Sequence, residues 1–145
     1  MLNHSNTKLL FTDQLEQAFK TFSAESILIF DQALLNNSNF LTNIKTHSAH
    51  YSVQGGEELK SVKHLPSHLE SIFKIIHNAQ IRKPTFVGIG GGSVSDFTGF
   101  IASIYQRGVA FDLVPTTWLA AVDSAHGGKN ALNLESHKNQ IGTFH

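Results

Sequence analysis

The stretch PTFVGIGGGSVSDFTGFIASI, residues 84–104, decides the fold. Its first six residues form an apolar run that is typical of a buried parallel strand, and Gly90, Gly91 and Gly92 follow directly. Apolar residues then recur at the three- and four-residue spacing of a helix, from Val94 to Ile104. A strand that passes through a glycine turn into a helix predicts a Rossmann-like α/β domain, a mostly parallel sheet with flanking helices.

The remainder of the chain continues this alternation of strands and helices. Further strands are predicted at residues 8–11, 27–30 and 109–114. A helix is predicted from Leu15, Ala18, Phe19 and Phe22, with Asp13 and Glu16 near its start, and another from residue 65 to 76, with Pro66 in its first turn. The last thirty residues show little periodicity and are expected to form binding loops.

Composition favours one globular domain spanning residues 1–145, since 41% of the residues are hydrophobic and 15% are charged. Eleven basic and eleven acidic residues balance, so nucleic acid and membranes are not expected partners. The chain has no cysteine, which favours a reducing compartment such as the cytoplasm. Neither a secretion signal nor an apolar run of membrane-spanning length is apparent.

The glycine turn is the first candidate site. Unpaired amide groups at the positive end of a helix suit a pyrophosphate, as in a dinucleotide such as NAD. The spacing Gly88-x-Gly90-x-x-Ser93 departs from the usual fingerprint, because serine replaces the last glycine. A second interpretation needs no ligand: Ser93 and Asp96 have the spacing of a capping box.

Polar residues gather again after the strand that ends near Pro115. They comprise hydroxyl, carboxylate, glycine, ammonium and amide groups: Thr116, Thr117, Asp123, Gly127, Gly128, Lys129, Lys138 and Asn139. One carboxylate with two lysines can hold a small molecule that carries both a phosphate and hydroxyl groups. Each of these residues can equally be a solvated surface group.

These motifs together resemble the 3-dehydroquinate synthase family. The resemblance rests on five ordered segments: GGGSVSD at 90–96, YQRG at 105–108, PTTWLAAVDS at 115–124, GGK at 127–129 and KNQIGTF at 138–144. It is strong from about residue 84 onward, thinner around residues 56–60, and topological before that.

The resemblance implies roles for individual residues. NAD would be contacted by Asp31, Glu57, Lys60, Gly91, Gly92, Ser93, Asp96, Thr116, Thr117, Lys129 and Lys138. The catalytic set would be Asp123 at a ring hydroxyl, Lys129 and Asn139 at the phosphate, and Arg107 reaching the substrate of a neighbouring subunit in a homodimer. The family's divalent metal, zinc or cobalt, is held by a carboxyl-terminal helical domain, and we expect this chain to stop before it.

The implied reaction converts 3-deoxy-D-arabino-heptulosonate 7-phosphate (DAHP) into 3-dehydroquinate and phosphate in the shikimate pathway. Three alternatives remain open: a related sugar-phosphate cyclase, a metal-dependent polyol dehydrogenase, and a non-catalytic NAD-binding fragment. The segment from Asp123 to Lys129 argues against the dehydrogenase.

Two groups of side chains are expected to be structural. His64 and His68 are interpreted as surface residues, not as a metal-binding pair, and His126 is interpreted as a structural or surface residue, not as a general base. The phenylalanines at 19, 22, 73, 86, 97, 100 and 111 are expected in the core.

Overall fold

The computed structural model describes residues 14–124 and 128–144. Helical segments are α1 (Leu15–Thr21), η1 (Gln32–Asn36), α2 (Ser38–Ile44), η2 (Glu57–Lys60), η3 (Val62–His64), α3 (Leu65–Asn78), α4 (Gly92–Ile104), η4 (Tyr105–Arg107) and η5 (Ala120–Ser124). Strands are β1 (Ser26–Asp31), β2 (His50–Val53), β3 (Thr85–Gly90), β4 (Phe111–Pro115), β5 (Lys129–Leu134) and β6 (His137–Phe144).

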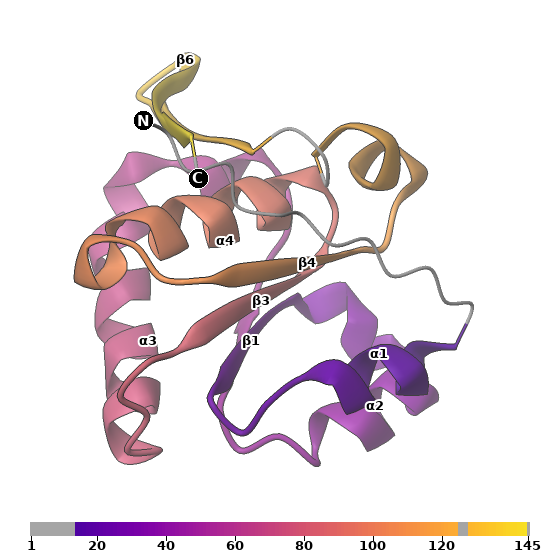
Figure 1. The fold of residues 1–145 in the computed structure, drawn as a ribbon. Helices are drawn as coiled ribbons and strands as arrows, with labels where there is room; N and C mark the ends of the chain where they lie inside the picture. The colour runs from indigo at the N-terminus through magenta and orange to yellow at the C-terminus, as the bar shows by residue number, and fades with distance from the viewer. Residues whose placement is uncertain (1–13, 125–127, 145) are drawn as a thin grey trace.

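The centre of the fold is a four-stranded parallel sheet in the order β2-β1-β3-β4. Helices α3 and α4 cover one face and the shorter α1 and α2 cover the other (Figure 1). The predicted Rossmann-like α/β architecture is therefore confirmed. Among the described residues, no helix combines the length and apolarity needed to cross a membrane.

Strand β1 shows how the sheet holds two cores apart. Ile27 and Ile29 point to the side of α3 and α4, while Leu28 and Phe30 point to the side of α1 and α2. All four side chains are buried, since alternate residues of a strand face opposite sides of a sheet and both faces are covered.

Glycines in β3 allow α4 to pack closely on the sheet. A Cβ at Gly88 would lie 2.7 Å from Oγ1 of Thr98 and 3.1 Å from Cδ2 of Leu113, while one at Gly90 would lie 2.7 Å from Cγ2 of Val94. Because these two glycines have no Cβ, α4 can lie directly against β3. This close contact fixes the turn that joins β3 to α4.

The last thirty residues differ from the expected loops. Strands β5 and β6 form an antiparallel hairpin beside α4, and a π-helical turn, η5, precedes it. Nearly all of β6 is exposed, and polar residues such as His137, Lys138 and Gln140 face solvent. The pattern lacks the apolar alternation of a half-buried strand, so the prediction from periodicity was wrong here.

Some of the other predictions are confirmed, some are wrong, and some fall on residues that the structure does not describe. The predicted helices match α1, α3 and α4, and the predicted strands match β1, β3 and β4. Strand β2 and helix α2 were not predicted. Phe73 was wrongly placed in the core, since 56% of its surface is exposed. The predicted strand at residues 8–11 and the cap at Asp13 lie outside the described residues.

Replacing Gly88 with alanine should destabilise the fold by about 1–3 kcal/mol, because the new methyl group overpacks the contact between α4 and β3. Gly91→Ala is the matched control, since its Cβ would lie 3.5 Å from the nearest side-chain atom, Cγ2 of Thr117. Urea unfolding followed by circular dichroism measures both. Equal unfolding free energies for the two variants would contradict this account of Gly88.

Candidate active site

All four parallel strands end at one edge of the sheet, and site residues follow each of them. Asp31 ends β1, Gly55 follows β2, Gly91 follows β3 and Thr116 follows β4. The strand order changes direction between β1 and β3, and ligands of open α/β sheets bind in the crevice at such a switch point. The topology therefore directs attention to the space beside Asp31 and Gly91.

Gly91 precedes α4 and is not required by the protein's own packing. Its φ of −81° and ψ of −173° are open to any residue, and a Cβ there would make only ordinary contact with Thr117. The amides of Gly92 and Ser93 lie in the first turn of α4, where no intrahelical acceptor exists. None of the hydrogen bonds among the described residues uses them. The turn thus presents donors and open space to an anion.

The capping-box interpretation of Ser93 and Asp96 was wrong. The residue before the helix is Gly91, and no side chain caps the helix there. The Ser93 hydroxyl instead accepts a hydrogen bond of 2.9 Å from the Gly56 amide, and Asp96 is bound by a lysine. Both side chains are therefore used to connect α4 to the loop after β2.

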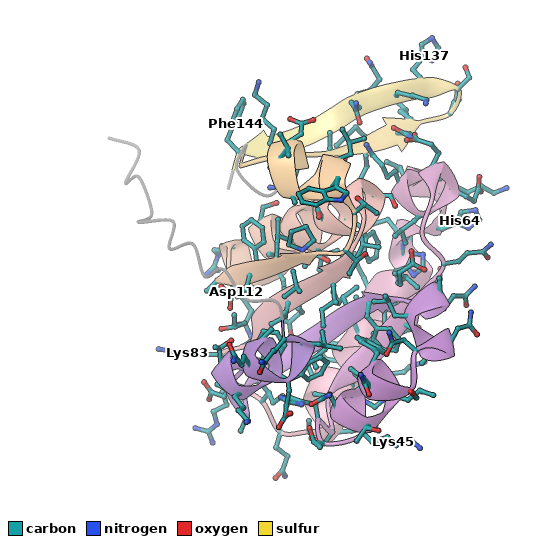
Figure 2. All side chains as sticks on the ribbon, turned by 90° about the vertical axis from the view of Figure 1, so that its right-hand side faces the viewer. Lys45, His64, Lys83, Asp112, His137 and Phe144 are labelled. Carbon is teal, nitrogen blue, oxygen red and sulfur yellow. The ribbon has the colours of Figure 1, made fainter. Side chains whose placement is uncertain are left out.

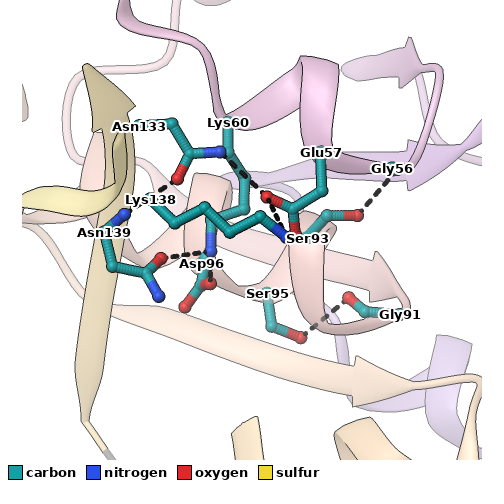
Figure 3. Close-up of polar contacts among 10 residues, drawn as sticks. All are labelled: Gly56, Glu57, Lys60, Gly91, Ser93, Ser95, Asp96, Asn133, Lys138 and Asn139. Atoms are coloured by element: carbon teal, nitrogen blue, oxygen red, sulfur yellow. Dashed lines mark hydrogen bonds and ion pairs between the residues drawn. The ribbon is translucent and has the colours of Figure 1, made fainter. Parts of the chain in front are cut away.

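That lysine is Lys60, whose ammonium group is buried. Its Nζ donates to Oδ2 of Asp96 and to Oδ1 of Asn139, both at 2.6 Å (Figure 3). Three elements far apart in sequence, η2, α4 and β6, meet at this one charge. Burial raises the pKa of the Asp96 carboxyl above its usual value, and Lys60 acts in the opposite direction.

Glu57 lies one turn before Lys60 and belongs to a second set of contacts. Its Oε2 accepts a hydrogen bond of 2.9 Å from Nδ2 of Asn133 and lies 3.7 Å from Nζ of Lys138. The Asn133 hydrogen bond is the main reason that the pKa of Glu57 is lowered. The stability that this interaction contributes is therefore present at neutral pH and is lost as the pH falls through the lowered pKa.

A cleft of about 550 Å³ lies between α4, η5 and the hairpin. Its charged and amide lining comes from Asp96, Asp123, Lys129, Asn130 and Asn139. Three residues of the predicted catalytic set, Asp123, Lys129 and Asn139, are thus brought together beside Asp96, which was predicted to contact the cofactor. A smaller hollow of about 180 Å³ lies at the opposite edge of the sheet and has no carboxylate or ammonium group in its lining.

The remaining predicted cofactor residues lie along the carboxyl edge of the sheet. The Asp31 carboxylate accepts from the Ala33 amide at 3.0 Å, and a Cβ at Gly55 would overlap this carboxylate. The Thr116 amide donates to the Gly90 carbonyl at 2.9 Å, and the Thr117 hydroxyl accepts from the Ala120 amide at 3.2 Å. The Thr116 hydrogen bond joins the end of β4 to the end of β3 at the glycine turn, whereas the Asp31 and Thr117 hydrogen bonds are local.

Arg107 is not brought to the cleft within one chain. It lies three residues beyond the carboxyl end of α4, whereas Asp96 lies near the start of that helix. At 1.5 Å per helical residue, Asp96 and the last residue of the helix, Ile104, are separated by roughly 12 Å along the helix axis. Arg107 is exposed, and its φ of 70° gives the backbone a left-handed conformation at this turn.

The histidines were predicted correctly only in part. His64 is partly exposed, and its Nε2 lies 2.8 Å from Oε1 of Glu58. His68 is half-buried instead of lying on the surface: its Nδ1 shares a hydrogen bond of 2.8 Å with the Tyr51 hydroxyl, and its ring packs 5.0 Å from that of Phe97. His126 lies outside the described residues. Within the described ranges no three His, Asp or Glu side chains are grouped so as to hold a metal ion.

Two site residues were missed in the sequence, Asn130 and Asn133. Both are buried in β5, where Asn130 lines the cleft and Asn133 contacts Glu57. Asparagine is depleted in strands, so two buried asparagines within six strand residues require specific hydrogen bonds. That signal becomes readable only once the segment is known to be a strand.

The parallel sheet with helices on both faces defines a Rossmann-like α/β domain. Residues 50–145 match the family model described as 3-dehydroquinate synthase N-terminal, about two thirds of the chain. The chain therefore belongs to the 3-dehydroquinate synthase family.

Individual relatives agree with this assignment. The 3-dehydroquinate synthase of Campylobacter jejuni is 37% identical over 97% of this chain, and that of Campylobacter hominis is 46% identical over 65% of it. These alignments cover 39% and 26% of the two relatives, so the chain spans about two fifths of the length of the first. Among solved structures, a 2-deoxy-scyllo-inosose synthase complexed with carbaglucose-6-phosphate, NAD+ and Co2+ matches with a TM-score of 0.69 and 26% identity, covering 90% of this chain and 37% of that one.

Replacing Lys60 with methionine should lower the free energy of unfolding by about 3–5 kcal/mol, because Asp96 loses the partner of a largely buried charge. The loss should shrink as the pH falls through the raised pKa of Asp96, since a protonated carboxyl needs no cation. Urea unfolding at pH 7 and at acidic pH measures both effects. Lys20→Met is the control, because its ion pair with Glu16 is exposed and should contribute less than about 1 kcal/mol. Equal losses in the two variants would contradict the assigned role.

Proposed function

We propose that this chain is the NAD-binding part of a 3-dehydroquinate synthase, which converts DAHP into 3-dehydroquinate and phosphate. The observation that carries the proposal is the adjacency of two features. Open amide groups at Gly92 and Ser93 begin the same helix, α4, whose Asp96 lines a cleft with Asp123, Lys129 and Asn139. A dinucleotide at the turn and a substrate in the cleft would therefore be neighbours. Family membership supports this division of the site.

The carboxyl edge of the sheet fits a dinucleotide. The pyrophosphate would accept from the amides of the turn, where the space between Gly91 and Thr117 is open. Asp31 would accept from hydroxyls at the adenosine end, while Ser93 and Thr116 would lie along the cofactor. Glu57, Lys60, Asp96 and Lys138 would complete its surroundings. When bound, NAD would supply redox chemistry, taking a hydride from the carbon that bears a substrate hydroxyl and later returning it.

The cleft fits a phosphorylated, hydroxylated substrate. No carboxylate among the described residues forms an ion pair with Lys129, so its charge is available for a phosphate. Asn139 keeps its amide Nδ2 for the same ligand, because its Oδ1 already accepts from Lys60. Asp123 would accept from a ring hydroxyl. Lys129 stabilises negative charge on the phosphate as it leaves.

Two parts of the proposal involve groups beyond this chain. Arg107, remote from its own cleft, would reach the phosphate in the cleft of a second copy, which gives a homodimer. We assign the catalytic metal, zinc or cobalt, to no residue described here. We place the reaction in the cytoplasm, in keeping with a chain that has no cysteine.

A related sugar-phosphate cyclase is the second candidate. The matched 2-deoxy-scyllo-inosose synthase, complexed with a carbaglucose phosphate, favours it. On either candidate this chain would use the same NAD site and Lys129 for the phosphate, and the candidates differ in the ring that is formed. Turnover of DAHP against turnover of glucose 6-phosphate distinguishes them.

Gly91→Ala should weaken NAD binding at least about tenfold, equivalent to about 1.4 kcal/mol, while leaving the fold intact. The added methyl group would occupy the space beside Thr117 that the cofactor needs. Isothermal titration of the chain with NAD measures the affinity, and circular dichroism checks the fold. Unchanged affinity in the variant would remove the glycine turn from the NAD site.

Lys129→Ala should lower turnover on the order of 10²-fold, as the loss of an electrostatic donor to a leaving group does. The test uses a chimaera in which this chain replaces the corresponding residues of the C. jejuni relative, with phosphate release from DAHP as the readout. Lys83→Ala is the control, since Lys83 is exposed and lies far from the hairpin (Figure 2). The chain by itself should release no phosphate. Near-normal turnover of the Lys129 variant would assign the phosphate to another cation.

A further inference from the structure

Strands β5 and β6 are interrupted by a bulge at the point where β6 supplies its site residues. Leu132 pairs with Ile141 and Leu134 with His137, so one residue on β5, Asn133, lies opposite three on β6. Those three are residues 138–140, which include Lys138 and Asn139 of the predicted site. Bulges next to active sites redirect side chains, and this one turns the two residues toward Glu57 and Lys60.

The side chain of Asn133 bridges this bulge. Its Oδ1 accepts a hydrogen bond of 2.9 Å from the Asn139 amide, in place of a backbone acceptor of the ladder. Its Nδ2 donates at 2.9 Å to Oε2 of Glu57, the first residue of η2 (Figure 3). Only 8% of the residue is exposed, so both groups would be costly to leave unpaired.

The backbone of Asn139 depends on this support. Its φ is 55°, a left-handed conformation that asparagine tolerates better than most residues but that is still uncommon. In this conformation its amide meets Asn133 while its own side chain accepts from Lys60. Asn133 therefore contacts the backbone of one proposed ligand-binding residue and the carboxylate of another.

We infer that Asn133 is a positioning residue. The two ends of its side-chain amide hold Asn139, on the substrate side, and Glu57, on the cofactor side, in their observed positions. The inference deepens the proposed function and rests on it for the roles of those two residues. Asn133 itself does not line the cleft, so it acts through its partners.

Only a side chain with one acceptor and one donor can serve both partners. An aspartate at this position would still accept from the Asn139 amide, but its second oxygen would face the Glu57 carboxylate. An alanine would leave both partners without their hydrogen bond. Both substitutions are therefore expected to remove the hydrogen bond to Glu57, the aspartate because it has no donor and the alanine because it has no polar group.

The first test compares the wild-type chain with Asn133→Asp and Asn133→Ala. Carbon-13 NMR of the Glu57 carboxyl should show its pKa raised in both variants, because the hydrogen bond that lowers it most is lost. Amide exchange at Asn139 should accelerate on the order of tenfold in Asn133→Ala. Gln140→Ala, on the same bulge, removes a side-chain amide that donates to the Lys138 carbonyl and should leave the Glu57 pKa unchanged. An unshifted Glu57 pKa in both Asn133 variants would overturn the inference.

A charge-conserving exchange provides the second test. The double variant Glu57→Gln with Asn133→Asp reverses the direction of the side-chain hydrogen bond. The side-chain amide introduced at position 57 would donate to the carboxylate introduced at position 133. That carboxylate would also accept from the backbone amide of Asn139. Amide exchange at Asn139 should return to the wild-type rate, whereas Asn133→Asp alone should exchange faster because of repulsion from Glu57. A merely structural role for Asn133 gives no such rescue, and exchange in the double variant that is as fast as in Asn133→Asp, or faster, would contradict the inference.

Neither readout requires a ligand, which separates this inference from the proposed function. The function is tested by NAD titration of the wild-type chain. If wild-type binds NAD, both single variants should bind it more weakly, and unchanged affinity would contradict the connection to the cofactor side. If wild-type does not bind NAD, the proposed function fails, while the Glu57 pKa and the Asn139 exchange still decide whether Asn133 positions its two partners.

Discussion

The site depends on one buried cation. Water cannot solvate the ammonium group of Lys60, so its charge must be met by protein oxygens, and Asp96 and Asn139 provide them. The requirement is strict, since removal of either oxygen leaves a charge in a poorly solvated place. This is why a segment after β2, a helix and a hairpin converge at one point. The hairpin is thereby held beside α4, and the cleft is the unfilled space between these two elements and η5.

The same constraint explains the division of labour among the charged residues. Lys60 is neutralised within the protein, whereas the second lysine at the cleft, Lys129, has no carboxylate partner among the described residues. Lys138 lies between these cases, with one long contact to Glu57 and a side chain that is 71% exposed. The buried lysine shapes the site, and the exposed ones are able to respond to a ligand.

Sequence reasoning predicted the elements that show a clear apolar pattern. Strands β1 and β3 are buried on both faces and appear as continuous apolar runs, and α3 and α4 have apolar residues at helical spacing. Strand β2 buries only Val53 and the hairpin exposes most of β6, so neither has a periodic pattern. Local spacing also cannot show that Lys60 pairs with residues 36 and 79 positions away. The family motifs named those residues, but only the fold shows that they touch.

The two sides of the site differ in how firmly they are built. Around the glycine turn, the chain is fixed by close packing at Gly90 and by hydrogen bonds from Thr116 and Gly56. Asp123 instead lies on η5, where Ala120 is buried but Val122 is 72% exposed, and nearby Trp118 is 88% exposed. A segment with so few buried apolar contacts has a low local free energy of opening. On the proposed function, the cofactor therefore meets a preorganised surface, whereas a substrate that contacts Asp123 must also order the turn that carries it.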